Sequence, residues 1–544
     1  MQLTKSDLAD AVHRGAPDGL ERPGTFDAIV IGAGAAGGLA AERLTQSGLK
    51  VLVLDAGFRP SFFRSPFRRF VAEAVSRAAN PNFLPFMPPS FLQKGRWALR
   101  KAGRVRQGIQ TECYAWERRP DAFVDDLDCP YTTPPDRPFL WIRARALQGR
   151  VGIPGHGRLY FRLGHDDFAP PDGLSPVWPF ALNEMDPWYA DVEIRLGIAG
   201  AQDGLPWLPD SEIKHALTPT AAEAALMGQL KARWPQFRPV LGRYAPPANT
   251  LVGAARTGRL TLRQGAIVRE VDVKNGKVTG VQWFDQASHS IRKAQAPLVF
   301  LCASALESTR ILMLSQDAAT GRAIGSQSNA LGHYLMDHII LHAEGSGAAL
   351  PGETTVKMED GRCVYLPRFD ARDDSAPQRG RGFGVQVYQV DMGQSRSYFG
   401  AAAFSEMLPR HENRVTLNRQ QLDRWGIPTL HIDCSHGEQD LVRIADETKA
   451  LRALADAAGI ALSRIDERAS PPGHAVHECG TARMGNDPAT SVLDPHNQCW
   501  DAAGLYVTDS ASFPSQGSQN PTLTVMALTA RACGHALQSA AHTS

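Results

Sequence analysis

The sequence predicts an α/β protein that combines two kinds of sheet. Two short apolar runs rich in β-branched residues, Phe26–Ile31 and Lys50–Asp55, are typical of buried parallel strands. The Ala- and Leu-rich stretch between them, which extends to Gln46, predicts a helix. Residues 345–430 instead alternate weakly between apolar and polar side chains, which indicates an antiparallel sheet. We therefore expect a parallel-sheet domain with an inserted domain built on an antiparallel sheet plus helices.

The first strand leads into the sequence GAGAAG, which has the spacing GxGxxG. Gly32 allows a tight turn, Gly34 lets the backbone approach a pyrophosphate, and Gly37 lets helix and strand pack closely. Asp55 follows at the interval that such sites use, about 20 residues, and its carboxylate can accept from ribose hydroxyls. These residues predict a Rossmann-like dinucleotide site, but they do not separate NAD from FAD.

The segment 59–106 is rich in Lys, Arg and Phe and contains a single acidic residue, Glu73. Two interpretations stay open. One is a lid or subunit-contact segment whose basic face lies in water. The other is a segment that attaches to an anionic surface or an acidic partner.

Three further elements complete the expected fold. Glu270–Val281 alternates around an Asn-Gly pair and predicts a β-hairpin. Pro297–Cys302 predicts a buried strand, followed by a helix over Ala305–Leu314. Glu438–Ala458 predicts an amphipathic helix that ends before Gly459. Its expected buried face consists of Leu441, Ala445, Thr448, Leu451 and Ala455.

The C-terminal part holds the residues with the clearest chemistry. His477 begins the segment HECGTARMG, and Asn520 precedes Pro521 and Thr522 at the start of an apolar helix that extends to about Leu537. Pro521 suits the first turn of a helix, and Asn520 suits its cap. A histidine has an ordinary pKa of about 6.5, so it can accept a proton near neutral pH. His477 is therefore a candidate general base.

Composition excludes several classes of protein. Hydrophobic residues make up 43% of the 544 residues and charged residues 21%, which excludes a disordered chain. The 58 Lys and Arg balance 56 Asp and Glu, so we expect no nucleic-acid partner. No run of about 18 apolar residues exists, so we expect no transmembrane segment. The eight cysteines form no CxxC pair, so we expect no metal site and a cytoplasmic location.

Taken together, these blocks resemble the glucose–methanol–choline (GMC) family of FAD-dependent oxidoreductases. Within that family they look most like the members that oxidise sugars or glycosides. The resemblance covers nearly the whole chain, with the blocks in family order. These are the GAGAAG turn, Arg143–Arg162, Pro297–Arg310, Gly332–His338 and the C-terminal segments. The resemblance implies a Rossmann-like FAD domain of the GMC and p-hydroxybenzoate-hydroxylase type, with an inserted substrate domain.

The resemblance also implies roles for individual residues. His477 and Asn520 match the catalytic positions. The implied FAD contacts are Gly32, Gly34, Gly37, Asp55, Ala56, Arg145, Gly149, Gly152, Val268, Ala303, Asp509, Ser510, Asn520, Pro521 and Thr522. Some relatives bind FAD covalently through a histidine, but Ile153 stands at that position and His156 three residues later, so we expect non-covalent FAD. His474 and His156 are rival candidates for the role of His477.

The implied reaction is the oxidation of a CH–OH group. His477 takes the hydroxyl proton, hydride goes to flavin N5, and the Asn520 amide holds the substrate oxygen. A sugar or glycoside is the expected substrate, with a non-sugar alcohol as the alternative. Alternatives from other classes are a non-redox or photochemical flavoprotein, a flavin-binding protein without alcohol oxidation, and an NAD-dependent dehydrogenase. The electron acceptor stays open among oxygen, a quinone and a redox protein, and a homo-oligomer is compatible with the sequence.

The expected organisation alternates between the two domains. Its segments are an N-terminal arm at 1–24, the FAD domain at 25–58, 251–335 and 475–544, a lid or basic-aromatic insertion at 59–138, a FAD-binding loop at 139–165, and the substrate domain at 166–250 and 336–474.

Overall fold

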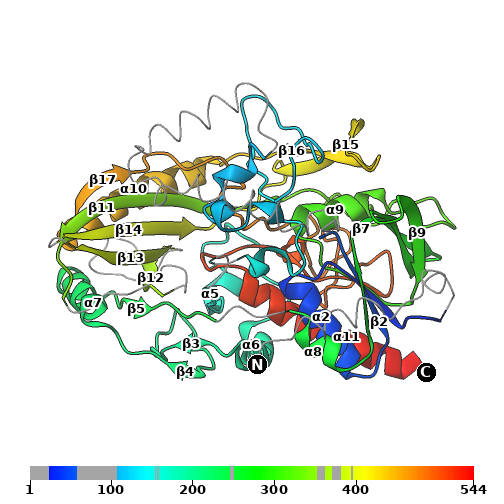
Figure 1. Ribbon diagram of the computed structural model, residues 1–544, viewed down its shortest axis with the longest axis horizontal. Coiled ribbons are helices and arrows are strands. Elements are labelled where there is room, and N and C mark those ends of the chain that lie inside the picture. The colour runs from blue at the N-terminus through cyan, green and yellow to red at the C-terminus, as the bar shows by residue number, and fades with distance from the viewer. Residues whose placement is uncertain are drawn as a thin grey trace, which may run out of the picture.

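The computed structural model describes residues 24–57, 107–153, 155, 159–245, 250–351, 362–369, 382–393 and 396–543 (Figure 1). The basic-aromatic segment 59–106, the N-terminal arm up to residue 23 and His156 lie outside the described residues. Within them, no helix combines the length and the apolar character that a membrane crossing requires.

A five-stranded sheet forms the dinucleotide-binding half. It consists of β1 (Ala28–Ile31), β2 (Val51–Asp55), β6 (Leu260–Gln264), β10 (Val299–Leu301) and β18 (Leu505–Val507). The strand order is β18-β10-β1-β2-β6, and every neighbouring pair is parallel. All residues of β1 and β2 are buried, as expected for a parallel sheet with both faces covered. The predicted parallel sheet is therefore confirmed, and it gathers strands from distant parts of the chain.

Helices cover this sheet. α2 (Ala35–Gln46) joins β1 to β2 and packs against α11 (Thr522–Thr543) and α8 (Val252–Arg256), and α11 also packs on α6 (Leu182–Leu196). In Figure 1, α2, α8 and α11 gather on the right-hand side together with β2. The strand order reverses at β1, because β2 follows on one side and β10 lies on the other. The carboxyl end of β1 is thus the point where such sheets bind ligands.

The second half is built on a six-stranded antiparallel sheet. It consists of β5 (Val240–Leu241), β11 (Ile339–Ala348), β12 (Val364–Phe369), β13 (Phe383–Gly393), β14 (Arg396–Ser405) and β17 (Ala461–Ile465), in the order β17-β11-β14-β13-β12-β5. The expected antiparallel sheet is confirmed. Its strands fall within the segments 166–250 and 336–474, whereas the domain boundaries themselves stay a prediction.

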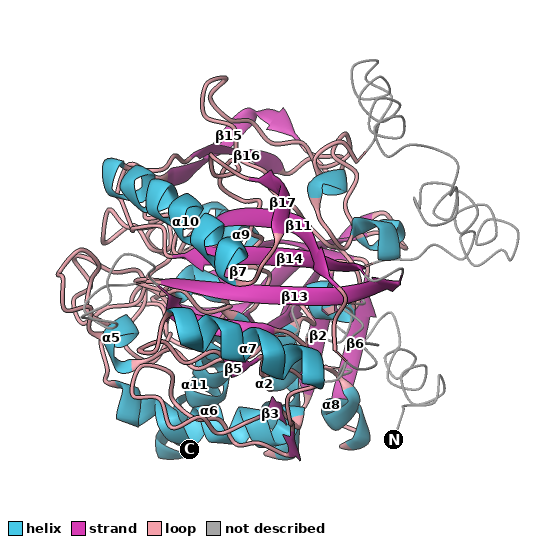
Figure 2. Cartoon of the chain, turned by 90° about the vertical axis from the view of Figure 1, so that its left-hand side faces the viewer, coloured by secondary structure: helices cyan, strands magenta, loops and turns pink. Residues whose placement is uncertain are grey.

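One face of this sheet is covered by a long helix. α10 (Glu438–Ala457) packs on β11, β14 and β17, and Figure 2 shows it lying across these strands. It also contacts α7 (Ala221–Arg233). The helix itself was predicted correctly, and Gly459 follows it with a φ of 66°. The predicted buried face was right in its second half, where Leu451 and Ala455 are buried, and wrong in its first half, where Leu441 and Ala445 are exposed and Ile444 is buried instead. Three acids, Asp440, Asp446 and Glu447, are buried, so apolar residues alone did not indicate the face.

A β-hairpin packs beside the parallel sheet, where β7 (Ala266–Lys274) contacts β2 and α9 (Ala305–Leu314). The hairpin of β7 and β8 (Lys277–Asp285), extended by β9 (Ser290–Gln295), turns at Asn275 and Gly276, whose φ values are 53° and 69°. Both residues lie in the left-handed region that a two-residue hairpin turn requires, so the predicted hairpin is confirmed. The remaining elements are α5 (His165–Phe168), β3 (Ala199–Gly200), β4 (His215–Ala216), β15 (Arg414–Leu422) and β16 (Pro428–Asp433).

Glu447 makes the stability of the protein depend on pH. Its carboxyl is buried, and burial raises its pKa to about 8, which the Ser405 hydroxyl offsets only in part. The unfolded chain loses this proton near the ordinary value of about 4.3, so the native state holds more protons between that pH and 8, and stability falls as pH rises across this window. We expect Glu447→Gln to raise the urea midpoint at about pH 9 but not at about pH 4.

The matched control is Glu438→Gln, which changes an exposed acid at the start of the same helix. It should not alter the pH dependence. Equal midpoints for the parent and Glu447→Gln at high pH would show that the carboxyl is not held neutral.

Candidate active site

A cavity of about 830 Å³ lies between the two halves. One end is formed by the carboxyl ends of β1, β2 and β10 and by the glycine turn that follows β1, and the other end by the inner face of β11, β13 and β14. His477 and Asn520 line the cavity together with residues from both ends. The cavity therefore joins the expected dinucleotide site to the expected substrate site.

The glycine turn has the geometry that a phosphate cradle needs. Gly32 has a φ of 94°, and a Cβ at this position would lie 2.4 Å from the Cys302 carbonyl oxygen. At Gly37 a Cβ would lie 1.9 Å from the Gly32 oxygen, so this glycine serves the packing of α2 on the turn. Gly34 is different, because the nearest atom to its Cβ position is 4.0 Å away, on Gln148. The space in front of Gly34, at the start of α2, is open to a ligand.

Asp55 stands at the end of β2 beside this turn. Its Oδ2 accepts from the Ala33 N–H at 2.9 Å, and its Oδ1 accepts from the Gly57 N–H at 2.8 Å. Burial raises the pKa of the carboxyl to about 6, although both hydrogen bonds favour the ionised form. Each oxygen retains acceptor capacity toward the cavity, which the Asp55 side chain lines.

Most of the predicted site residues come together at the cavity. Those that line it are Gly32, Gly34, Asp55, Ala56, Arg145, Gly149, Val268, Ala303, His477, Asp509, Ser510, Asn520, Pro521 and Thr522. Gly37 and Gly152 are not part of the lining. Gly152 ends the short 3₁₀ helix Gly149–Gly152, and a Cβ there would lie 3.2 Å from the Gln148 side chain. The same short helix brings Gly149 against Gly34, with a Cβ position 3.3 Å from the Gly34 Cα.

His477 and Asn520 contact each other directly. The Asn520 Nδ2 lies 3.1 Å from the His477 Nε2, and the Asn520 Oδ1 accepts from the Gln386 amide at 3.3 Å. The Tyr388 hydroxyl in turn donates to the Gln386 Oε1 at 2.9 Å. Both polar atoms of Asn520 are thus engaged across the cavity. We expected the Asn520 side chain to cap the helix that follows. Instead α11 begins two residues later, at Thr522, and the side chain contacts His477 and Gln386.

His338 sets the tautomer of His477. The His338 Nε2 lies 3.0 Å from the Gly517 carbonyl oxygen, which can only accept, so this nitrogen carries a hydrogen. Burial lowers the pKa of His338 to about 4, so its Nδ1 is unprotonated near neutral pH. Two groups face that atom, the Gln516 Nε2 at 3.1 Å, which donates, and the His477 Nδ1 at 3.0 Å, so the contact favours the tautomer with a hydrogen on the His477 Nδ1. The His477 Nε2 is then an acceptor, in agreement with the Asn520 amide that faces it.

Asp337 holds the loop that carries His477. Its carboxylate accepts backbone N–H groups from Gly473 at 2.7 Å, Ala475 at 3.1 Å and His477 at 2.9 Å. This loop includes Val476 with a φ of 57°, a strained conformation for a β-branched residue. The carboxylate is 1% exposed, and burial and, next, the charge of Glu478 raise its pKa to about 7. The buried hydrogen bonds therefore hold a backbone geometry that the sequence would not adopt alone.

Arg150 ties the same loop to the glycine turn. From the short helix against Gly34, its guanidinium donates to the Val476 carbonyl at 2.7 Å, to the Glu478 Oε2 at 2.9 Å and to the Ser304 hydroxyl at 3.1 Å. Glu478 is 2% exposed, so this ion pair is largely shielded from water.

Sequence reasoning missed His338, Asp337, Gln386 and Arg150 as site residues. The block Gly332–His338 was noted, but its role was not. Each of them contacts residues that lie 134 to 328 positions away in the sequence and are brought close by the fold; His338 and His477, for example, are 139 positions apart. The rival His474 also lines the cavity, but its ring contacts His342, with the centroids 6.2 Å apart, on the side of the sheet.

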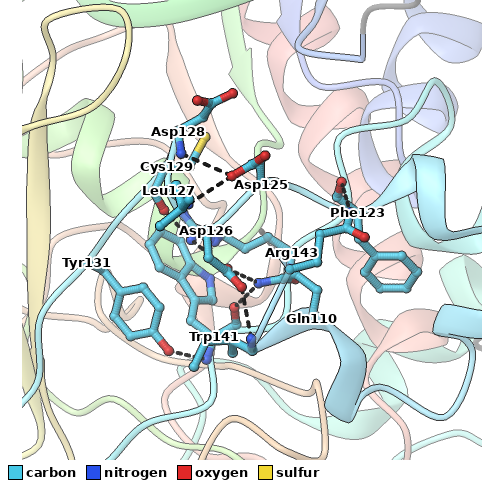
Figure 3. A network of polar contacts seen from close by, with 12 residues as sticks. Gln110, Phe123, Asp125, Asp126, Leu127, Asp128, Cys129, Tyr131, Trp141 and Arg143 are labelled. Atoms are coloured by element: carbon cyan, nitrogen blue, oxygen red, sulfur yellow. Dashed lines mark hydrogen bonds and ion pairs between the residues drawn. The ribbon is translucent and has the colours of Figure 1, made fainter. Parts of the chain in front are cut away.

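A second polar network supports the cavity wall formed by Trp141–Arg145 (Figure 3). The Gln110 amide donates to Asp126 at 2.7 Å and to the Trp141 carbonyl at 3.1 Å, and it accepts from the Arg143 N–H at 2.7 Å. The Arg143 guanidinium stacks over the Trp141 ring at 4.1 Å. Because Arg145 lies two residues further along and pairs with Glu307 at 3.0 Å, this network sets the position of the cavity wall.

A Rossmann-type sheet whose cavity meets a histidine–asparagine pair is the arrangement of a dinucleotide-dependent oxidoreductase. Residues 409–529 match the family model described as GMC oxidoreductase, and residues 30–70 match a model described as NAD(P)-binding Rossmann-like domain. The C-terminal part of the chain therefore matches the GMC oxidoreductases, which are generally FAD-binding flavoproteins, and these matches support an oxidoreductase. The family and the fold class expected from the sequence are thereby confirmed.

Several known proteins are similar along most of the chain. Paromamine 6'-oxidase of Streptomyces fradiae is 27% identical over 565 residues, covering 97% of this chain and 93% of that protein. 2-Methyl-1,2-propanediol dehydrogenase of Mycolicibacterium austroafricanum is 28% identical over 474 residues, covering 73% and 82%. The solved structure of pyridoxine 4-oxidase from Mesorbium loti aligns with a TM-score of 0.59 over 94% of this chain and 98% of that one, at 19% identity, which supports the fold.

Asp337→Asn should loosen the loop 473–477. An amide nitrogen cannot accept, so at least one of the three backbone donors loses its partner, at a cost of about 1–3 kcal/mol. We expect a lower urea midpoint and faster amide hydrogen exchange over residues 473–477. The control is Asp487→Asn, an exposed turn carboxylate that accepts from the Ala489 N–H, for which we expect a change within about 0.5 kcal/mol. Unchanged exchange in the loop would contradict this role of Asp337.

Proposed function

We propose that this chain oxidises a CH–OH group with FAD, and that a sugar or glycoside hydroxyl is its substrate. The observation that carries the proposal is the position of His477, which lines the cavity with its Nε2 3.1 Å from the Asn520 amide nitrogen. The Gly517 carbonyl favours this tautomer through His338, and a substrate hydroxyl then has to replace the Asn520 N–H at the His477 Nε2 lone pair.

The residues present fit FAD at the dinucleotide end. The open space at Gly34 and the start of α2 suit a pyrophosphate, and the Asp55 carboxylate suits the ribose hydroxyls. Ala303, Asp509, Ser510, Pro521 and Thr522 line the cavity near the catalytic pair and are proposed to hold the flavin ring. When bound, FAD accepts hydride at flavin N5. We propose that it is held non-covalently, because the fully buried Ile153 stands where some relatives have a linking histidine.

The chain's own groups activate the alcohol. The His477 Nε2 accepts the hydroxyl proton while the substrate carbon gives up its hydrogen with the bonding electron pair, so the CH–OH group becomes a carbonyl. The Asn520 amide donates a hydrogen bond to the substrate oxygen as negative charge develops on it. The His477 Nδ1–H keeps donating to the neutral His338, which holds the imidazole in place throughout.

Two substrate classes have support among similar proteins. The name of paromamine 6'-oxidase supports a glycoside, and the name of 2-methyl-1,2-propanediol dehydrogenase supports a small non-sugar alcohol as the second candidate. Relatives are named both oxidases and dehydrogenases, so the acceptor is proposed as oxygen, a quinone or a redox protein, to be separated by reoxidation assays. A cytoplasmic location and a homo-oligomer stay predictions.

His477→Ala should abolish most of the activity while FAD stays bound. Positioned base catalysis contributes about 10²–10⁴-fold, so we expect a loss of that order in the rate of anaerobic flavin reduction by a sugar or alcohol. The matched control is His474→Ala, which removes a cavity histidine that does not contact Asn520 and should lose far less. Flavin reduction as fast as in the parent would remove His477 from this role. Failure of every alcohol to bleach the parent flavin would favour a non-redox or photochemical flavoprotein.

His338→Leu removes the acceptor for the His477 Nδ1–H. We expect the flavin reduction rate to fall on the order of tenfold, the effect of one lost hydrogen bond, while FAD content is retained. Because His338 is neutral above about pH 4, its own titration should leave no step in the pH profile between about pH 5 and 8. His338→Gln offers an acceptor again and should recover part of the rate. Equal losses in both variants would indicate a packing role only.

Acid precipitation should release the flavin into the supernatant. Ile153 carries no nucleophile, so no covalent bond forms at that position. The control is His156→Ala. A yellow pellet from the parent and a colourless pellet from His156→Ala would instead assign a covalent bond to His156.

A further inference from the structure

The inner face of the six-stranded sheet presents side chains to the cavity in rows. β13, β14 and β11 are neighbours, and their register aligns Gln386, Ala402 and His342 in one row and Tyr388, Gly400 and Glu344 in the next. All six residues line the cavity. Because a strand rises about 3.4 Å per residue, the two rows lie about 7 Å apart, roughly the width of one sugar ring.

The first row lies beside the reacting pair. Gln386 hydrogen-bonds Asn520 at 3.3 Å, and the Phe404 ring, two residues along β14 from Ala402, lies 5.8 Å from the His477 ring. The small side chain of Ala402 leaves room between the hydrogen-bonding groups of Gln386 and His342. A substrate ring whose hydroxyl reacts at His477 therefore lies against this row of side chains.

The second row has a different character. A Cβ at Gly400 would lie 3.1 Å from the Tyr398 hydroxyl oxygen and 3.2 Å from its Cε1, so the Tyr398 ring lies over Gly400. Glu344 lies opposite Gly400 on β11, and Arg464 lies 3.6 Å from the Glu344 carboxylate. Burial and, next, the charge of Glu344 raise the pKa of Tyr398. A glycine inside a central strand weakens the sheet and often marks a close approach, and here it makes room for an aromatic platform bordered by polar groups.

We propose that this platform is a second subsite, which binds the second ring of a two-ring glycoside while the first ring reacts over Ala402. The proposal rests on the proposed function and names its substrate class. An aromatic ring face covers the apolar face of a sugar or an aryl group, and Tyr388, Glu344 and Arg464 are placed to bond the hydroxyls or amines at its rim. A free monosaccharide fills the first row only and leaves the platform in water.

The test compares matched one-ring and two-ring compounds. Anaerobic flavin reduction is measured for the free hexose, the methyl glycoside and the phenyl glycoside of glucose, galactose and glucosamine, with 2-methyl-1,2-propanediol as a non-sugar alcohol. We expect the phenyl glycosides to have a higher kcat/KM than the methyl glycosides of the same sugar. In Tyr398→Ala this ratio should fall on the order of tenfold, and in Tyr398→Phe, which keeps the ring, the ratio should persist.

Gly400→Val is the second variant, because its side chain displaces the Tyr398 ring without removing it, and it should lower the same ratio. FAD content and urea midpoints check that each variant is folded. A ratio near one in the parent, or a ratio unchanged in both Tyr398→Ala and Gly400→Val, overturns the subsite. Oxidation of the non-sugar alcohol alone also overturns it but leaves the oxidation of a CH–OH group standing. If no compound bleaches the flavin, the proposed function fails as well.

Discussion

The hydrogen bond between the Gly517 carbonyl and His338 decides the state of the whole site. A backbone carbonyl has no alternative protonation state, so it determines which nitrogen of His338 carries the hydrogen. Burial keeps the second nitrogen unprotonated, so it accepts from the Gln516 amide and favours a hydrogen on the His477 Nδ1 that faces it. The direction of each hydrogen bond then follows as far as the Asn520 amide. Through His338, the Gly517 carbonyl oxygen thus favours a tautomer of His477 whose Nε2 carries no hydrogen.

Holding that arrangement requires buried charge. Asp337 fixes three backbone N–H groups of the histidine loop, and Arg150 pairs with Glu478 while it also reaches the Val476 carbonyl. A buried carboxylate is costly unless several donors satisfy it, and here the donors belong to the loop that must stay rigid. Because Arg150 comes from the short helix against Gly34, one guanidinium holds both the glycine turn end of the cavity and the loop that carries His477. The strain at Val476 is sustained by these contacts.

The two sheets contribute different groups to the cavity. The parallel sheet supplies backbone: a glycine turn, the start of α2 and the end of β2. The antiparallel sheet supplies side chains, because alternate residues of β11, β13 and β14 all face the cavity. Because every second residue of a strand faces the cavity, a substitution can change one row of side chains without disturbing the next. Substrate preference can therefore vary on this face while the glycine turn end of the cavity stays the same. His477 and Asn520 lie where the two ends meet.

The sequence by itself determined the local features. The GAGAAG turn, Asp55, the Asn275-Gly276 hairpin and the helix α9 depend on interactions within short segments, and each was predicted at its position. His477 and Asn520 were found because both stand in recognisable segments. The tertiary structure alone decided the partners of His477, because His338 and Gly517 become neighbours of it only when separate segments pack together. It also decided the buried face of α10, where Asp440 and Glu447 face inward against the apolar pattern. Burial and long-range hydrogen bonds depend on packing, which no local window of sequence contains.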